Sequence, residues 1–236
     1  MADRSETREQ SLGILGGTFN PPHLGHLAVA RHARQELGLE RVLLVPAHTA
    51  PYKSSDSGAG GSSGVAGSDP GPQHRLRMCQ LAVAGDEGLA VSAVEVDRGG
   101  LSYTVDTLRS IHASHPNAQL TFIVGADTAS TLGSWREPAQ LLELAQLAVA
   151  TRDGTGRQRV LDALAAVEST GAGGSSQQHS TVGGVSFLEM PAIEVSSSQV
   201  RERVARGEAI DQLVGPAVAD YIAAHQLYRV GVAVSR

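Results

Sequence analysis

The chain has 236 residues, with 19 lysine and arginine residues against 24 aspartate and glutamate residues, so its formal net charge is −5 at pH 7. The hydrophobic share of 41% is enough for one sizeable core, and the length fits one large α/β domain better than two independent ones. The mildly acidic balance argues against a general nucleic-acid binder or a membrane-surface binder, because both need a dominant basic face. The net charge does not exclude a protein that binds small anionic ligands, since such a site needs only a few local cations.

Cysteine usage and hydropathy indicate a reducing, cytoplasmic compartment. The single cysteine, Cys79, excludes an intramolecular disulfide framework and a multi-cysteine zinc site. No apolar run approaches the roughly 18 residues of a membrane span, and residues 1–10 are polar and charged rather than typical of a signal peptide.

Short apolar runs alternate with helical patterns along the chain. Strands are predicted over residues 11–16, 41–46, 90–96, 119–125, 147–151 and 185–191. Helices are predicted over residues 24–37, 74–84, 104–113, 138–144, 158–168, 197–206 and 216–225. Because the strand runs are apolar throughout rather than alternating, we expect helices on both faces of the sheet. The predicted fold is α/β, a Rossmann-like doubly wound parallel sheet with right-handed crossovers and a C-terminal helical part.

Two segments interrupt this pattern. Residues 54–72 and 169–184 consist mostly of Ser, Gly, Ala and other small or polar residues. Neither can bury enough apolar area to offset its ordering entropy, so both are predicted to be flexible surface loops. For the second, a tolerated insertion is favoured over a functional lid. We expect residues 11–236 to form a single domain, and residues 1–10 to form a disordered tail.

The strongest chemical signal is the sequence GGTFNPPHLGH at residues 16–26, between the first predicted strand and the first predicted helix. In an open parallel sheet, ligands bind at this end of a strand, and glycines let backbone N–H groups approach phosphate closely. His23 and His26 lie at the helix start, where the helix dipole favours an anion and two imidazoles can donate to phosphate oxygens. The motif is neither a GxGxxG fingerprint nor a Walker A loop. The alternative is a capping turn with incidental histidines, which the glycines in front of it disfavour.

Three later positions are further candidates. The serines at 196–198 supply hydroxyls and an N-cap to a helix whose first turn presents Arg201, which together could bind phosphate or be an ordinary cap with a solvated arginine. Asp127 ends the most apolar predicted strand and could accept from ribose hydroxyls or cap the next helix. Trp135, the sole tryptophan, could stack on a planar heterocycle or pack in the core.

These motifs carry a family resemblance. Residues 16–26 resemble the T/HxGH signature of the nucleotidyltransferase superfamily, which also includes class I aminoacyl-tRNA synthetases. With four further segments, in order and spacing over residues 12–228, the chain is similar to bacterial nicotinate-mononucleotide adenylyltransferases. The segments are PAHTAPYK at 46–53, RGGLSYTVDTL at 98–108, FIVGAD at 122–127 with SWR at 134–136, and VSSSQVR at 195–201 with LVGP at 213–216.

The resemblance implies a nucleotidyltransferase domain that transfers AMP from ATP to nicotinate mononucleotide, giving nicotinate adenine dinucleotide and pyrophosphate. It implies that Mg²⁺ is bound through the ATP phosphates, with no protein metal ligand. The implied partners are these small molecules, with no nucleic acid and no membrane, and homo-oligomerisation is left open.

The resemblance also implies roles for individual residues. His23, His26 and Arg201 would be catalytic, the histidines neutralising developing charge and the arginine holding the leaving pyrophosphate. Lys53 would contact the acceptor 5′-phosphate, Trp135 would stack on the nicotinate ring, and Thr104 with the backbone near Arg136 would receive the nicotinate carboxylate. The implied ATP contacts are Gly16, Gly17, Thr18, Phe19, Gly25, Gly125, Asp127, Ser197 and Ser198.

The chain departs from the family pattern at a few positions. Asn20 stands where the family usually has Asp, which keeps the hydrogen bonding but loses a charge that bears on a nearby metal or base. Ser198 replaces Thr and keeps the hydroxyl, while Val195 and Val200 replace Ile conservatively. His48 occupies a position the family leaves variable and is given no role.

Three alternative functions are kept. A sister adenylyltransferase with phosphopantetheine or nicotinamide mononucleotide as acceptor explains the histidines and Arg201 equally well, but Thr104 and Trp135 suit a flat anionic pyridine. A non-catalytic nucleotide-binding protein has no need of an intact α-phosphate site. An RNA-binding protein of synthetase ancestry is disfavoured by the charge of −5.

Overall fold

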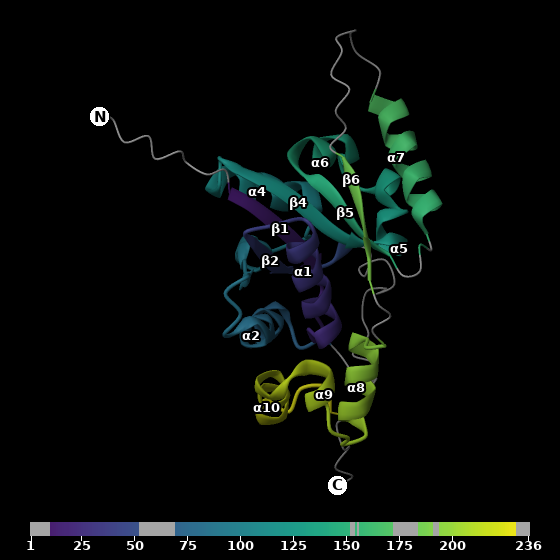
Figure 1. Cartoon of the computed structure of the whole chain (residues 1–236). Helices are drawn as coiled ribbons and strands as arrows, with labels where there is room; N and C mark the ends of the chain where they lie inside the picture. Colours follow the sequence, from purple (N-terminus) through teal and green to yellow (C-terminus); the bar gives the residue numbers. More distant parts are fainter. Residues whose placement is uncertain are drawn as a thin grey trace, which may run out of the picture.

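The computed structural model describes residues 10–51, 69–151, 154, 156–171, 184–190 and 194–229, without the side chains of residues 170 and 171. Within these residues six strands form one sheet (Figure 1): β1 (Gln10–Gly17), β2 (Arg41–Pro46), β3 (Leu89–Val91), β4 (Ala118–Gly125), β5 (Gln146–Thr151) and β6 (Val185–Glu189). Their order is β3-β2-β1-β4-β5-β6, and every neighbouring pair is parallel. The predicted Rossmann-like parallel sheet is confirmed.

Helices connect the strands. They are α1 (Leu24–Glu36), α2 (Pro72–Val83), α3 (Val94–Arg98), α4 (Thr104–Ser114), α5 (Ala126–Ala129), the 3₁₀ turn η2 (Leu132–Ser134), α6 (Pro138–Leu144), α7 (Arg157–Gly171), α8 (Ser197–Ala205), α9 (Asp211–Val214) and α10 (Pro216–Ala224). Figure 1 shows α8, α9 and α10 gathered beyond the sheet, next to α2. Met78 of α2 is fully buried in an apolar cluster with Val200, Val214 and Ile222 of these helices, which forms the expected C-terminal helical part.

Both faces of the sheet are apolar and covered. On one face, Ile14 and Phe122 pack with Leu108 of α4 and Leu141 of α6. On the other face, Leu15, Val42 and Ile123 pack with Leu27 and Ala30 of α1 and Cys79 of α2. This two-sided burial explains why the strands are mostly apolar on both faces instead of alternating between apolar and polar residues.

The prediction of a strand over residues 90–96 is wrong after Val91. The Ser92 hydroxyl accepts from the N–H of Val94 at 3.4 Å, and α3 begins there and buries Glu95 and Val96. An apolar run of this length is compatible with a buried strand or a buried helix turn, so the pattern alone could not separate the two. The short elements α5, η2 and α9 were not predicted.

The two predicted loops and the predicted tail lie mostly outside the described residues. Of the first loop, residues 69–71 precede α2, which begins at Pro72 rather than after the loop. Of the second loop, residues 169–171 belong to α7 instead. Gln10 is the first residue of β1 and not part of the predicted tail, and residues 1–9 lie outside the described residues. Within the described ranges, every helix is too short or too polar to cross a lipid bilayer.

Gly13 marks the tightest packing of the central strand. A Cβ at this position would lie 2.8 Å from Leu39 Cδ1, 2.9 Å from Val42 Cγ2 and 3.0 Å from Ile123 Cδ1. All three side chains are buried, so Gly13→Ala should lower the free energy of unfolding by about 1–3 kcal/mol through overpacking.

Denaturant unfolding measures this change. The matched control is Gly133→Ala, because no atom lies within 4 Å of a Cβ built there. The control should stay within about 0.5 kcal/mol of the wild type. Equal stability of the two variants would contradict the packing described for β1.

Candidate functional site

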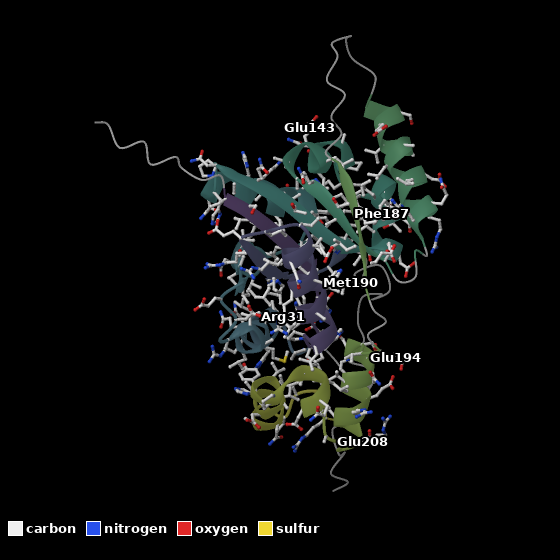
Figure 2. The ribbon with its side chains drawn as sticks, viewed as in Figure 1. Arg31, Glu143, Phe187, Met190, Glu194 and Glu208 are labelled. Carbon is white, nitrogen blue, oxygen red and sulfur yellow. The ribbon has the colours of Figure 1, made fainter. Side chains whose placement is uncertain are left out.

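A cavity of about 730 Å³ opens at the carboxyl ends of the strands and is called the central cavity here. The strand order reverses between β1 and β4, and in open parallel sheets ligands bind at such a switch point. The cavity is lined by Gly16 and Gly17 at the end of β1, Gly125 at the end of β4, and Met190, labelled in Figure 2, just after β6. Its volume suits a bound small molecule.

The central cavity brings together most of the residues singled out from the sequence. The candidate residues that line it are Gly16, Gly17, Thr18, His23, Gly25, His26, Thr104, Gly125, Trp135, Arg136 and Ser197. Phe19, Asp127, Ser198 and Arg201 are not among the lining residues, and Lys53 lies outside the described residues.

The glycine-rich turn is supported from beneath by Phe19. This side chain is buried, and its backbone has φ = 50°, in the left-handed region. A Cβ at Gly17 would meet the Phe19 ring at 3.1–3.3 Å, so Gly17 leaves the ring its space under the turn. Phe19 therefore shapes the turn from the protein interior.

His23 and His26 form a stacked pair at the start of α1. His23 is the N-cap residue of α1, and the two ring centroids are 3.7 Å apart at an interplanar angle of 29°. His26 Nδ1 accepts from the backbone N–H of His23 at 3.1 Å. A neutral His26 therefore carries its proton on Nε2. His23 Nδ1 is buried without a hydrogen-bond partner among the described residues.

Burial makes both imidazoles difficult to protonate. Desolvation lowers the pKa of His23 to about 4, and desolvation together with the nearby His23 lowers the pKa of His26 to about 3. Both rings are thus neutral near pH 7 and present hydrogen-bond donors rather than fixed cations. An anion next to them would raise both pKa values, because a nearby opposite charge favours the protonated form.

Trp135 packs against the core and also lines the central cavity, the two environments considered from the sequence. Its ring packs edge-on against Phe122, with centroids 5.9 Å apart at 75°, and its Nε1–H donates to Thr131 Oγ1 at 3.0 Å. The side chain is nevertheless only half-buried and lines the central cavity. The core contact and the indole hydrogen bond fix the orientation of the ring at the cavity wall.

Arg136 is held beside this wall. Its guanidinium lies 4.9 Å from the Tyr103 ring centroid and pairs with Asp106 and Glu137, each at 3.4 Å. Tyr103 and Thr104, the residues around the start of α4, line the cavity next to it. This side of the cavity therefore offers the rings of Tyr103 and Trp135, the hydroxyl of Thr104 and the partly exposed positive charge of Arg136.

The start of α8 is attached to the histidine loop. Ser196 is the N-cap and accepts from the Gln199 N–H at 3.1 Å, which confirms the predicted serine cap. Arg201 donates to the Asn20 carbonyl at 2.7 Å and to Ser198 Oγ at 3.1 Å, and Ser197 donates to the Pro21 carbonyl at 2.9 Å. Among the described residues, two of the five N–H donors of Arg201 thus bond to protein acceptors.

Asn20 and Asp127 have different surroundings. Asn20 is buried, and its Oδ1 accepts from the Tyr228 hydroxyl at 2.7 Å, so it links the loop to the end of the C-terminal helical part. The Asp127 side chain is 94% exposed and lies 3.4 Å from Arg159, which makes a solvent-screened pair. Asp127 lies in the first turn of α5, whose N-cap is Gly125 without a side-chain cap hydrogen bond, so the predicted alternative of Asp127 as the helix cap is wrong.

Sequence reasoning missed two buried charged residues near the cavity. Glu95 lines it and accepts a 2.5 Å hydrogen bond from Thr107. Arg75 is 1% exposed and donates to backbone carbonyls of the loops that follow β1 and β2. Glu95 was assigned to the predicted strand over residues 90–96 and received no role, and Arg75 was assigned to the predicted helix over residues 74–84 without a role. Within the described residues, no group of three or more His, Cys, Asp or Glu side chains could hold a metal ion.

The lowered histidine pKa values predict a pH-dependent stability. Between pH 6.5 and the folded-state values the unfolded chain binds more protons, so the free energy of unfolding falls as pH drops through this range. Urea unfolding at pH 7 and pH 5 should show this loss in the wild type and a smaller loss in His26→Asn. An identical loss in both proteins would contradict the burial described for His26.

Comparisons with known proteins agree with this geometry. A cytidylyltransferase-like family model matches residues 14–203. The chain is 37% identical over 221 residues to a protein named "Probable nicotinate-nucleotide adenylyltransferase" in Trichlorobacter lovleyi, covering 92% of this chain and 99% of the relative. A protein of the same name in Salinibacter ruber is 35% identical over 219 residues, covering 93% and 98%.

The fold is also found in solved structures. The Plasmodium falciparum nicotinic acid mononucleotide adenylyltransferase complexed with NaAD aligns with a TM-score of 0.67 at 18% identity, over 94% of this chain and 99% of the other. At this identity the likeness shows the fold alone. With the family model and the curated relatives, the conclusion is that the chain belongs to the nicotinate-nucleotide adenylyltransferase family.

Proposed function

We propose that this chain transfers the adenylyl group of ATP to nicotinate mononucleotide, giving nicotinate adenine dinucleotide and pyrophosphate. The observation that carries the proposal is the composition of the central cavity, where a glycine-rich turn and a histidine pair share one space with Trp135 and Thr104. Relatives at 35% and 37% identity that are named for this activity support it. With its one cysteine reduced and buried, the enzyme would act in the cytoplasm.

The reaction needs positioning more than it needs a base. An oxygen of the acceptor 5′-phosphate attacks the α-phosphorus, a new P–O bond forms, and the bond to the β-phosphate oxygen breaks to release pyrophosphate. The attacking phosphate is already an anionic nucleophile, so catalysis is alignment and stabilisation of charge on the α-phosphate. The Nε2–H of His26 is the donor whose direction the structure fixes, because its Nδ1 is occupied by the His23 N–H.

The remaining candidate residues divide between the two substrates. On the ATP side, Arg201 would keep its bond to Asn20 and direct its other donors to the leaving pyrophosphate, next to Ser197 and Ser198. Asp127, in the first turn of α5 just after β4, would accept from the ribose hydroxyls. Mg²⁺ would enter on the ATP phosphates and offset their charge, since phosphate oxygens and water can complete its shell without a protein cage.

On the acceptor side, a flat anionic ring suits the wall built by Trp135. The indole would stack on the nicotinate ring. The Thr104 hydroxyl and the backbone N–H near Arg136 would receive the carboxylate, with the positive charge of Arg136 close by. Lys53 would contact the 5′-phosphate. A neutral carboxamide would gain less from this charge, which favours nicotinate over nicotinamide mononucleotide.

Pyrophosphate release tests the proposal. The full-length protein is incubated with ATP and Mg²⁺ plus nicotinate mononucleotide, nicotinamide mononucleotide or phosphopantetheine in parallel. We expect the highest kcat/KM with nicotinate mononucleotide. Preference for either other acceptor would overturn the substrate assignment, and ATP binding without pyrophosphate release would indicate a nucleotide-binding protein without this activity.

His26→Ala tests the role of the histidine pair. Removing one preorganised donor from the α-phosphate should lower kcat by about 100-fold or more, while the KM for ATP changes much less. The matched control is His32→Ala, which removes a histidine from the same helix but outside the lining of the central cavity. A His26→Ala enzyme with a kcat close to that of the control would exclude this role.

A further inference from the structure

Arg75 is a fully buried cation whose contacts are mostly backbone carbonyls. Its side chain is 1% exposed. Nη1 donates to the carbonyls of Thr18 at 2.8 Å and Ala47 at 2.6 Å, and Nη2 donates to the carbonyl of His48 at 2.9 Å. Nε donates to Asp69 Oδ1 at 2.9 Å, and this carboxylate is 48% exposed.

Such burial is costly unless the charge is fully compensated. Removing a guanidinium from water costs several kcal/mol in effective terms, and only well-formed hydrogen bonds offset it. In the described contacts, each of the three nitrogens of Arg75 has at least one acceptor at hydrogen-bond distance. A planar fork with five donors can do this, whereas the compact ammonium of a lysine cannot reach the same set.

The carbonyls belong to two loops on adjacent strands. Thr18 follows β1 in the glycine-rich turn, and Ala47 and His48 follow β2. The Ala47 N–H donates to the Gly17 carbonyl at 2.9 Å, just beyond β1 and β2. Past this backbone hydrogen bond, Arg75 connects the two loops by donating to carbonyls of both. Thr18 and Ala47 both line the central cavity, so Arg75 bonds to the backbone of two of its walls.

The same contact fixes a peptide orientation in the turn. In a planar trans peptide the C=O and the following N–H point in opposite directions. Drawing the Thr18 carbonyl toward Arg75 therefore turns the Phe19 N–H away from it. This N–H has no hydrogen-bond partner within the described part of the chain, and unpaired N–H groups in such turns are anion donors.

We propose that Arg75 is a positioning residue for adenylyl transfer, which locks the glycine-rich turn after β1 to the acceptor-side loop after β2. It acts through backbone carbonyls and touches neither substrate. Without the hydrogen bonds of Arg75, the two loops can separate. A misplacement of the reacting groups by about 1 Å can lower the rate by about 100-fold. The inference rests on the proposed function.

The test compares Arg75→Lys with Met78→Ala at saturating ATP and nicotinate mononucleotide. Met78 lies on the same helix and is fully buried, but it packs toward the C-terminal helical part, away from the cavity. Both variants lose stability, so kcat is measured at a temperature where circular dichroism shows both folded. Arg75→Lys should lower kcat roughly tenfold to a hundredfold while each KM changes less than about threefold, and Met78→Ala should keep kcat within about twofold.

Each outcome decides the proposal. A wild-type kcat in Arg75→Lys, or an equal loss of kcat in Met78→Ala, overturns it. If Arg75→Lys does not fold, Asp69→Ala removes the half-exposed carboxylate that accepts from Arg75 Nε and from the Gly71 N–H. It should lower kcat by about two- to fivefold without a matching rise in KM, and unchanged kcat overturns the proposal. The wild type is assayed alongside: absence of product there refutes the proposed function, whereas product formation with unaffected variants refutes only the role of Arg75.

Discussion

The parallel pairing of β1 with β4 at the centre of the sheet is the constraint on which the rest of the site depends. The register of this pair aligns Leu15 with Ile123, so the carboxyl ends of both strands lie next to each other on the same side of the sheet. The helix after β1 packs on one face and α6, after β4, packs on the other. The segments that follow β1 and β4 therefore turn to opposite faces of the sheet. The central cavity lies between them, at the carboxyl ends of the two strands.

This placement orients the histidine pair before any substrate binds. The histidine pair sits at the start of α1, beside buried Phe19, and desolvation keeps both rings neutral near pH 7. Donors held in place before a substrate arrives need no rearrangement when charge develops, and they act more strongly where water is excluded. The cost is a buried His23 Nδ1 that has no hydrogen-bond partner among the described residues, as expected where some stability is given up for function.

The sequence was most informative where local pattern and tertiary structure agree. Continuous apolar runs predicted the buried strands, and the glycine-histidine motif predicted the strand-to-helix turn that lines the cavity. The pattern failed at residues 94–96, because a buried helical turn and a buried strand share one apolar signature. Arg75 was unpredictable for another reason, since its partners are carbonyl groups of distant loops and leave no trace in side-chain identity. The contacts of Arg201 and Tyr228 with Asn20 are equally non-local.

A structure with bound product tests most directly whether one cavity, at the carboxyl ends of β1 and β4, binds both the adenylyl group and the pyridine nucleotide. The measurement is a crystal structure of the protein grown with nicotinate adenine dinucleotide. We expect the pyridine ring to stack on Trp135, its carboxylate to lie at Thr104, and the phosphate nearest the adenosine to lie beside His26. A dinucleotide bound away from the glycine-rich turn, or a pyridine ring on another wall, would contradict it.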